Sequence, residues 1–241
     1  DSLDPQLLEG VDASGLSRDL FEGLYNLGPD GATVPGVATH HDVSDDNLTY
    51  TFHLRDTAKW SDGKPVTAGD FVYAWRRAVD PATASPYAWY MELMSLEGAK
   101  AIIAGEAGTE TLGVTALDDH TLEVKLSQPL PYFADMVAHA TTFPAPKWAI
   151  EEHGVEWTRP GNLVGNGAYV LTEHVIKERA VRERNPMYWD DENTVLEKVV
   201  SLVIGDEASA LTRYRAGELD RTDIPAGQYP ALKEELPDEA F

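Results

Sequence analysis

The sequence contains no cysteine among its 241 residues. This absence excludes disulfide bonds, thiolate metal ligands and a cysteine nucleophile. The chain also lacks any apolar run near the ~18 residues that a membrane-spanning helix requires, which predicts a soluble protein. Its first residues do not combine a basic segment with an apolar one, so no signal peptide is expected within this chain.

Positive charge is scarce. The sequence has 19 Lys and Arg residues against 41 Asp and Glu residues, a formal net charge of −22. Nucleic acids and anionic membranes are bound by basic surfaces, so neither is expected as a partner. The acidic residues are spread through every segment, which indicates a solvated acidic surface. We interpret this surface as adapted to salt, because such self-repulsion requires screening by counterions; an ordinary acidic protein is the alternative.

Motifs of common catalytic and metal sites are also missing. The sequence has no Gly-x-Ser-x-Gly elbow, no phosphate-binding Gly-rich loop and no His-x-x-x-His pair. His40 and His41 are adjacent, and neighbouring side chains on a strand point to opposite faces, so the pair should chelate a metal poorly. We therefore predict no catalytic residue, no metal ligand and no cofactor, and expect a protein that is not an enzyme. A hydrolase with an acidic site remains a less favoured alternative.

What the sequence does contain is a clear strand, turn and helix. Residues 50–55 alternate apolar and polar side chains, the pattern of a half-buried strand. The segment 61–65 carries turn residues, and Thr67 with Asp70 resembles a capping box at the start of a helix that reaches Val79. The apolar stripe of this helix consists of Phe71, Val72, Trp75 and Val79.

Other segments mix strands and helices without strict alternation. Ser14 is expected to open an early helix, and Asp206 to cap a late one that stops at Gly217. Further expected elements are a helical stretch over 87–94, a strand around 122–126, a meander over 169–183 and a strand over 195–204. The predicted class is mixed α/β, of the α+β type.

The segment TFHLRDTAKWSDGKPVTAGDFVYAW, residues 51–75, closely resembles the signature of the oligopeptide-binding receptors of bacterial ABC importers, extracellular solute-binding protein family 5. Further matching stretches, in the same order along the chain, are 2–5, 17–23, 80–81, 84–87, 116–120, 166–169, 184–190 and 213–218. The resemblance therefore runs almost from the first residue to about Asp220, and so many ordered matches are far more specific than one short motif.

This resemblance implies a periplasmic-binding-protein-like architecture, in which two lobes close over a ligand. The first lobe is discontinuous and would comprise residues 1–22 and 147–241 of this chain. An inserted small α+β domain would comprise residues 23–146. Members of the family are about twice as long, so the second lobe is expected to be absent here and to lie beyond Phe241.

The resemblance also implies where a ligand is contacted. Glu9, Gly10 and Val11 occupy the stretch at which relatives touch a bound peptide, and Tyr87 matches a tyrosine that touches it from the inserted domain. Without the resemblance, Val11 would be read as a packing residue and Tyr87 as a core aromatic.

The expected function is that of a peptide receptor delivering oligopeptides to the membrane permease of an ABC importer. The resemblance places such a receptor in the periplasm, or outside the cell tethered to the membrane, as a monomer. A receptor of the same family for another solute, such as a dipeptide, a nickel chelate or haem, remains an alternative.

Overall fold

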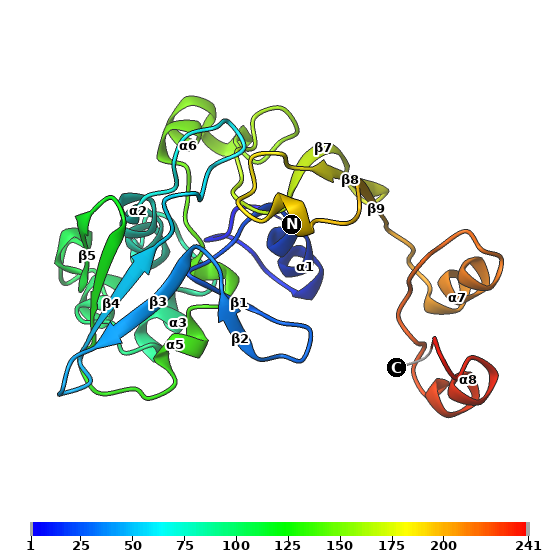
Figure 1. Cartoon of the computed structure of the whole chain (residues 1–241), viewed down its shortest axis with the longest axis horizontal. Coiled ribbons are helices and arrows are strands. Elements are labelled where there is room, and N and C mark those ends of the chain that lie inside the picture. The colour runs from blue at the N-terminus through cyan, green and yellow to red at the C-terminus, as the bar shows by residue number, and fades with distance from the viewer. Residues whose placement is uncertain (1, 240–241) are drawn as a thin grey trace. The chain divides into compact units, whose positions relative to one another are not determined.

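Residues 2–239 are described by a computed structural model, in which helices and short sheets are mixed along the chain (Figure 1). The helices are α1 (Val11–Leu20), α2 (Ala68–Val79), α3 (Ala88–Leu93), α4 (Ala99–Ile103), α5 (Phe133–Met136), α6 (Lys147–His153), α7 (Glu207–Arg215) and α8 (Tyr229–Glu235). The strands are β1 (Tyr25–Leu27), β2 (Thr33–Pro35), β3 (Ala38–Val43), β4 (Thr49–Leu54), β5 (Val114–Asp118), β6 (Thr121–Lys125), β7 (Tyr169–Val175), β8 (Arg179–Arg184) and β9 (Lys198–Leu202). The predicted mixed α/β class is confirmed. None of the helices in this described part is long and apolar enough to cross a bilayer.

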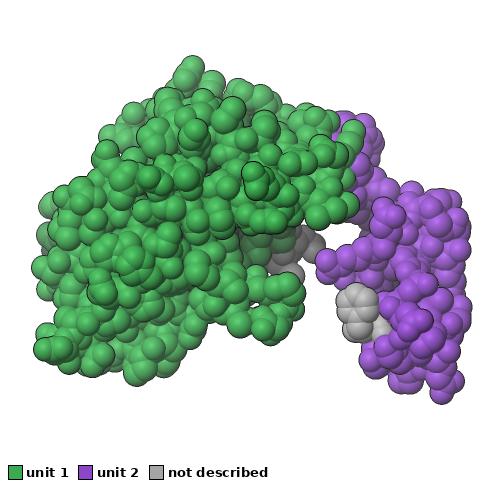
Figure 2. All heavy atoms as spheres, in the orientation of Figure 1, with its two compact units in different colours: residues 1–172, 182–199 green, residues 173–181, 200–241 purple. Residues whose placement is uncertain are grey.

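The chain divides into two compact units, which Figure 2 colours separately. Unit 1 comprises residues 1–172 and 182–199, and unit 2 comprises residues 173–181 and 200–241. Each of these units is compact in itself. The inserted domain expected at residues 23–146 is a different division, and it stays a prediction.

Unit 1 is built around a four-stranded antiparallel sheet of order β3-β4-β6-β5. Tyr50, Phe52 and Leu54 of β4 are buried, while the alternate residues are half-buried. The predicted alternating strand is therefore confirmed. Helix α2 packs on this sheet against β5 and β6, and buries Phe71 and Trp75 completely.

The start of α2 confirms the predicted capping box. The Asp70 carboxylate accepts hydrogen bonds from the Thr67 backbone N–H at 2.8 Å and from the Trp60 indole N–H at 3.1 Å. Burial raises the pKa of Asp70, and these hydrogen bonds oppose the increase. One carboxylate thus fixes both the helix start and the buried Trp60 of the preceding turn.

Helix α1 begins earlier than predicted. Its N-cap is Gly10 rather than Ser14, and Gly10 has φ of 80°, a conformation that favours glycine. The Ser14 hydroxyl instead donates to the Gly10 carbonyl oxygen at 3.0 Å, inside the first turn. A serine hydroxyl can also bond the carbonyl four residues back inside a helix, so the sequence signal was ambiguous.

Unit 2 contains α7 and α8, which share a small core around the buried residues Leu211 and Leu232. Asp206 caps α7 as predicted, accepting the Ser209 backbone N–H at 2.9 Å. The strand expected over 195–204 is shorter in the structure, where β9 is the third strand of the sheet β7-β8-β9. Apolar alternation extends beyond the residues that pair, so it overestimated the strand's length.

Candidate functional site

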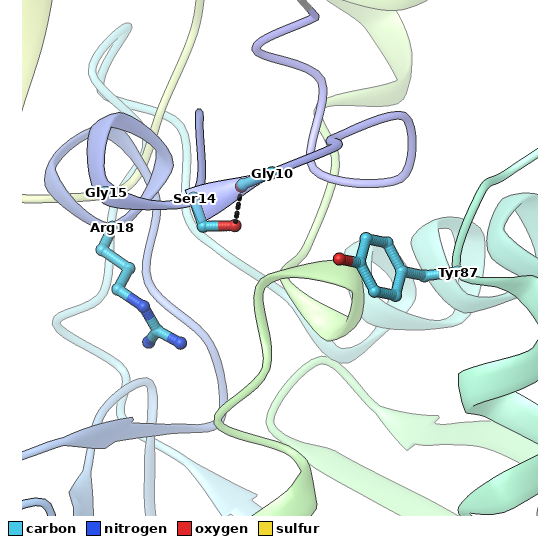
Figure 3. Close-up of a pocket in the computed structure, with 5 residues that line it drawn as sticks. All are labelled: Gly10, Ser14, Gly15, Arg18 and Tyr87. Atoms are coloured by element: carbon cyan, nitrogen blue, oxygen red, sulfur yellow. Dashed lines mark hydrogen bonds between the residues drawn. The ribbon is translucent and has the colours of Figure 1, made fainter. Parts of the chain in front are cut away.

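A surface pocket of about 380 Å³ lies in unit 1 between the start of α1 and the residue that precedes α3. Its lining residues are Gly10, Ser14, Gly15, Arg18 and Tyr87. Figure 3 shows the Tyr87 ring extending toward the first turn of α1, with its hydroxyl pointing toward that turn. The pocket brings together two chain segments about 70 residues apart in the sequence.

The α1 side of the pocket follows from helical spacing. Gly10, Ser14 and Arg18 are four residues apart, so they lie above one another on the same side of the helix start. A Cβ atom added at Gly10 would have no neighbour within 4 Å, so the backbone there is open to a ligand. The first turn of a helix also has backbone N–H groups without intrahelical partners, which can donate to an oxygen of a bound molecule.

The opposite side is aromatic. The Tyr87 ring lies 5.0 Å from the His139 ring and 5.8 Å from the Trp89 ring, between centroids. His139 in turn stacks on Tyr90 at 4.4 Å. Trp89 is 55% exposed although it is a large apolar residue. Of these rings only Tyr87 lines the pocket, where its face can contact apolar side chains of varied shape, and the other rings pack beside it as an aromatic wall.

Arg18 is the only charged residue among the described residues that line the pocket. Its guanidinium donates to the Ala138 carbonyl oxygen at 3.1 Å, which holds the side chain against the protein. Burial lowers the pKa of Arg18, yet a guanidinium remains protonated at neutral pH. The pocket therefore contains a positive charge in a chain whose net charge is −22.

His139, next to Tyr87, is neutral at pH 7. Burial lowers its pKa, and the nearby Arg18 charge lowers it further. Its Nδ1 atom accepts the Thr141 backbone N–H at 3.2 Å, so the ring proton is on Nε2. Burial also raises the pKa of Tyr90 to about 12, and its hydroxyl donates to the Met136 carbonyl oxygen. His139 and Tyr90 support the aromatic wall, and both pKa shifts favour their uncharged forms.

Of the four residues expected to contact a ligand, two line this pocket. Gly10 and Tyr87 both line it, whereas Glu9 is exposed directly before Gly10 and is not part of the lining. Val11 begins α1, but its side chain lies outside the described residues. Their role in binding stays a prediction. Sequence reasoning missed Ser14, Gly15 and Arg18, although the four-residue spacing from Gly10 would have indicated Ser14 and Arg18.

A second pocket, of about 640 Å³, lies within unit 2. It contains the carboxylates of Asp220, Glu235 and Glu239, which is relevant to the alternative of an acidic-site hydrolase. Glu235 is paired with Arg215 at 2.6 Å, and Glu239 accepts a hydrogen bond from the Tyr214 hydroxyl. The first of these bonds joins α7 to α8, and the second joins α7 to the segment after α8, which accounts for two of the three carboxylates without catalysis.

Comparison with known proteins agrees with the resemblance over nearly the whole chain. The family model of bacterial extracellular solute-binding proteins, family 5 Middle, matches residues 32–239. The periplasmic oligopeptide-binding protein OppA of Escherichia coli K12 is 52% identical over 240 residues, which are 99% of this chain and 44% of that protein. The periplasmic murein peptide-binding protein MppA of the same organism is 49% identical over 241 residues, again covering 44% of its length.

Solved structures give the same result. The unliganded open form of MppA matches with a TM-score of 0.95 at 49% identity, over 99% of this chain and 46% of that one. Haemophilus influenzae OppA in complex with the peptide RPPGFSPFR matches with a TM-score of 0.93 at 44% identity, over 98% and 46% of the two chains. The chain thus spans somewhat less than half the length of these relatives. It belongs to family 5 of the bacterial extracellular solute-binding proteins.

Proposed function

We propose that this chain is part of a periplasmic receptor that binds short peptides and delivers them to an ABC importer. The observation that carries the proposal is the pocket that joins Gly10 to Tyr87, because the family resemblance had indicated both residues independently of the structure. Relatives that are about half identical are named as oligopeptide-binding and murein peptide-binding proteins. No catalytic role is included, and the receptor acts as a monomer by binding and release.

The chemistry of the pocket suits a peptide. The open backbone at Gly10 and the first turn of α1 offer main-chain groups that can pair with a peptide backbone, which every sequence shares. The Tyr87 ring supplies an apolar face that tolerates varied side chains. Arg18 supplies a positive charge for a carboxylate, whether at the peptide's C-terminus or on an acidic side chain.

Strong binding should require more of the protein than this chain. The pocket is a surface hollow formed within unit 1. The proteins to which this chain is similar are more than twice as long as the chain. Enclosure of a ligand between two lobes removes water and adds contacts from both sides. We therefore expect the 241-residue chain to bind peptides weakly compared with the longer protein that contains it.

The test is calorimetric titration of the complete receptor with short peptides rich in alanine or lysine. Tyr87→Ala should weaken binding by roughly 3–10-fold, the loss expected for one aromatic contact. Tyr87→Phe separates the contribution of the ring from that of the hydroxyl. Tyr132→Ala is the control for loss of a tyrosine ring outside the pocket, because Tyr132 is exposed and does not line the pocket, whereas Tyr87 is half-buried and does.

Two outcomes would overturn parts of the proposal. A receptor that ignores peptides but binds a nickel chelate or haem would remain in the family and refute the peptide assignment. A receptor that binds peptides equally well with Tyr87→Ala and Tyr132→Ala would refute the role of this pocket.

A further inference from the structure

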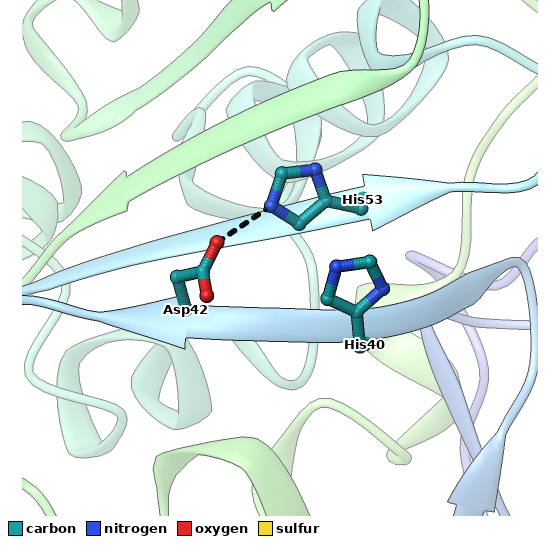
Figure 4. Close-up of side chains that lie close together, drawn as sticks. All are labelled: His40, Asp42 and His53. Atoms are coloured by element: carbon teal, nitrogen blue, oxygen red, sulfur yellow. Dashed lines mark hydrogen bonds and ion pairs between the residues drawn. The ribbon is translucent and has the colours of Figure 1, made fainter.

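The face of the four-stranded sheet opposite its core carries a cluster of His40, Asp42 and His53 (Figure 4). His40 and Asp42 are two residues apart on β3, so they share a face, and His53 lies directly opposite His40 on β4. A register shift between Ala38 and His40 precedes the cluster. His40 and Asp42 are exposed and His53 is half-buried, so all three can be reached from solvent.

The distances within the cluster are short. Asp42 Oδ2 lies 2.8 Å from His53 Nε2, and the two imidazole rings stack with centroids 4.4 Å apart and planes 13° apart. One ligand atom from each residue can be chosen so that all three lie within 4.8 Å of one another. Two ligands of one tetrahedral ion stand roughly 3.3 Å apart, since zinc–nitrogen bonds are about 2.0–2.1 Å long. Small rotations of exposed side chains would close this difference.

A neighbouring hydroxyl group also orients one histidine of the cluster. The Thr39 hydroxyl oxygen lies 2.8 Å from His40 Nδ1, and the same hydroxyl donates to the His53 carbonyl oxygen at 3.2 Å. A hydrogen bond on one ring nitrogen is the usual way in which a protein orients a metal-binding histidine. The contact leaves His40 Nε2 for an ion, and Figure 4 shows a ring nitrogen of His40 on the side that faces Asp42 and His53.

We propose that His40, Asp42 and His53 form a surface site for one divalent ion of the late first-row transition metals, with Zn²⁺ as the reference ion. Two imidazoles and one carboxylate suit Zn²⁺, Ni²⁺ or Cu²⁺ better than Mg²⁺ or Ca²⁺, which prefer oxygen ligands alone. Water fills the remaining coordination positions. The site shares no residue with the pocket at Gly10 and Tyr87, and it does not depend on the proposed function.

The sequence concealed this site because its ligands meet across two strands. His40 and His41 are adjacent, and His41 turns to the opposite face, where its Nδ1 lies 2.6 Å from the Tyr25 hydroxyl. The partner of His40 is instead His53, thirteen residues later, and only the pairing of β3 with β4 reveals it. An ion held there would link the two strands and stabilise their hairpin.

The experiment is calorimetric titration of the chain with Zn²⁺, with Co²⁺ absorption in the visible region as a report on coordination. A large excess of Mg²⁺ is present throughout, because the 41 acidic residues bind divalent ions weakly wherever carboxylates are exposed. We expect one Zn²⁺ per chain under these conditions. The thermal midpoint should also rise with Zn²⁺ concentration, since a ligand that binds only the folded state stabilises it.

Variants identify the ligands. His40→Ala, His53→Ala and His53→Gln should each lower Zn²⁺ affinity by at least about 100-fold, beyond the effect usual for an outer-sphere change. Asp45→Asn, in the exposed turn of the same hairpin, is the matched control and should leave affinity unchanged. Circular dichroism in the near ultraviolet verifies that each variant is folded. Absence of stoichiometric Zn²⁺ binding in excess Mg²⁺, or equal affinity in the histidine variants and the control, would overturn the proposal.

Discussion

Glu22 is a carboxylate held in the interior of unit 1, with 3% of its surface exposed. It accepts hydrogen bonds from the Tyr188 hydroxyl and the Trp189 indole N–H, both at 2.6 Å, and from the Asn26 amide at 2.8 Å. A buried acid survives only when its oxygens are satisfied in this way. Glu22 thereby ties the segment after α1 to the loop that follows β8.

Glu22→Gln is predicted to destabilise the fold by about 1–3 kcal/mol, the usual cost of leaving a buried polar group unpaired. Glutamine has one oxygen where glutamate has two. Its amide NH₂ would therefore face the Trp189 N–H, or else the donors of Tyr188 and Asn26. Urea denaturation of both proteins at pH 7 measures the difference, and equal stability would show that these contacts contribute little.

The difference in unfolding free energy between the protein and its Glu22→Gln variant should also depend on pH, in a predictable direction. Burial raises the pKa of Glu22, and the hydrogen bonds from Tyr188, Trp189 and Asn26 oppose the increase. The folded state therefore keeps this proton to higher pH than the unfolded chain, whose glutamates titrate near ~4.3. The stability that protonated Glu22 contributes is complete below that value and is lost as pH rises through the folded pKa.

Glu22→Gln does not titrate at this position, so its deficit in unfolding free energy should be larger at low pH than at pH 7. Other carboxylates titrate in both proteins, and their effects cancel in the difference. A deficit that grows as pH rises would mean that the pKa of Glu22 is lowered by folding.

Single residues also show why the candidate site was only partly predictable. Only the family resemblance could indicate Tyr87 as a ligand contact. From the sequence alone, a tyrosine at this position is equally well explained as an aromatic residue of the core. Arg18 carried a weak local signal, its helical spacing from Gly10, which becomes useful only when Gly10 is known to start the helix. That these residues line one pocket depends on the folding of the roughly seventy residues between them, which no local pattern encodes.

At the scale of elements, α2 offers a direct test of packing. Trp75 is fully buried and its indole N–H donates to the Thr142 carbonyl oxygen at 2.7 Å. Trp75→Ala should cost about 3–5 kcal/mol, as large aromatic deletions in a core do. Trp89→Ala, in α3, removes a tryptophan that is 55% exposed and should cost no more than about 1 kcal/mol. Chemical denaturation compares the two, and similar losses would contradict the packing described for α2.

The elements that the sequence predicted well are those whose signal is local. The alternation in β4 and the capping box of α2 lie within a few residues, and the structure has both. The predicted start of α1 was wrong because its N-cap residue, Gly10, has no side chain that could form a capping hydrogen bond. The pairing of β3 with β4 could not be predicted, because strand register depends on residues from different segments. The histidine cluster, which this pairing creates, was therefore not predicted either.

At the scale of the whole molecule, the excess of negative charge lies at the surface. Among residues 2–239 whose burial is described, the buried acids are Asp4, Glu22 and Asp70, and each has a partner. The other carboxylates whose burial is described are wholly or partly exposed. Over the full sequence, only 19 basic residues offset 41 acidic ones. Repulsion among these charges opposes the compact state, and isolated surface ion pairs relieve little of it.

Salt should therefore stabilise this protein. The Debye length falls from about 10 Å at ~0.1 M to about 3 Å at ~1 M monovalent salt, which screens most repulsion between neighbouring surface charges. We predict that the thermal midpoint at pH 7 rises continuously as NaCl increases over this range. The matched control is the same titration near pH 4.5, the isoelectric point of the sequence, where the net charge approaches zero and the salt effect should be much smaller. Two outcomes would contradict this prediction: a thermal midpoint that is independent of salt at pH 7, and one that is equally dependent on salt at both pH values. Either outcome would show that charge repulsion does not limit stability. The basis for interpreting the acidic surface as an adaptation to salt would then be removed.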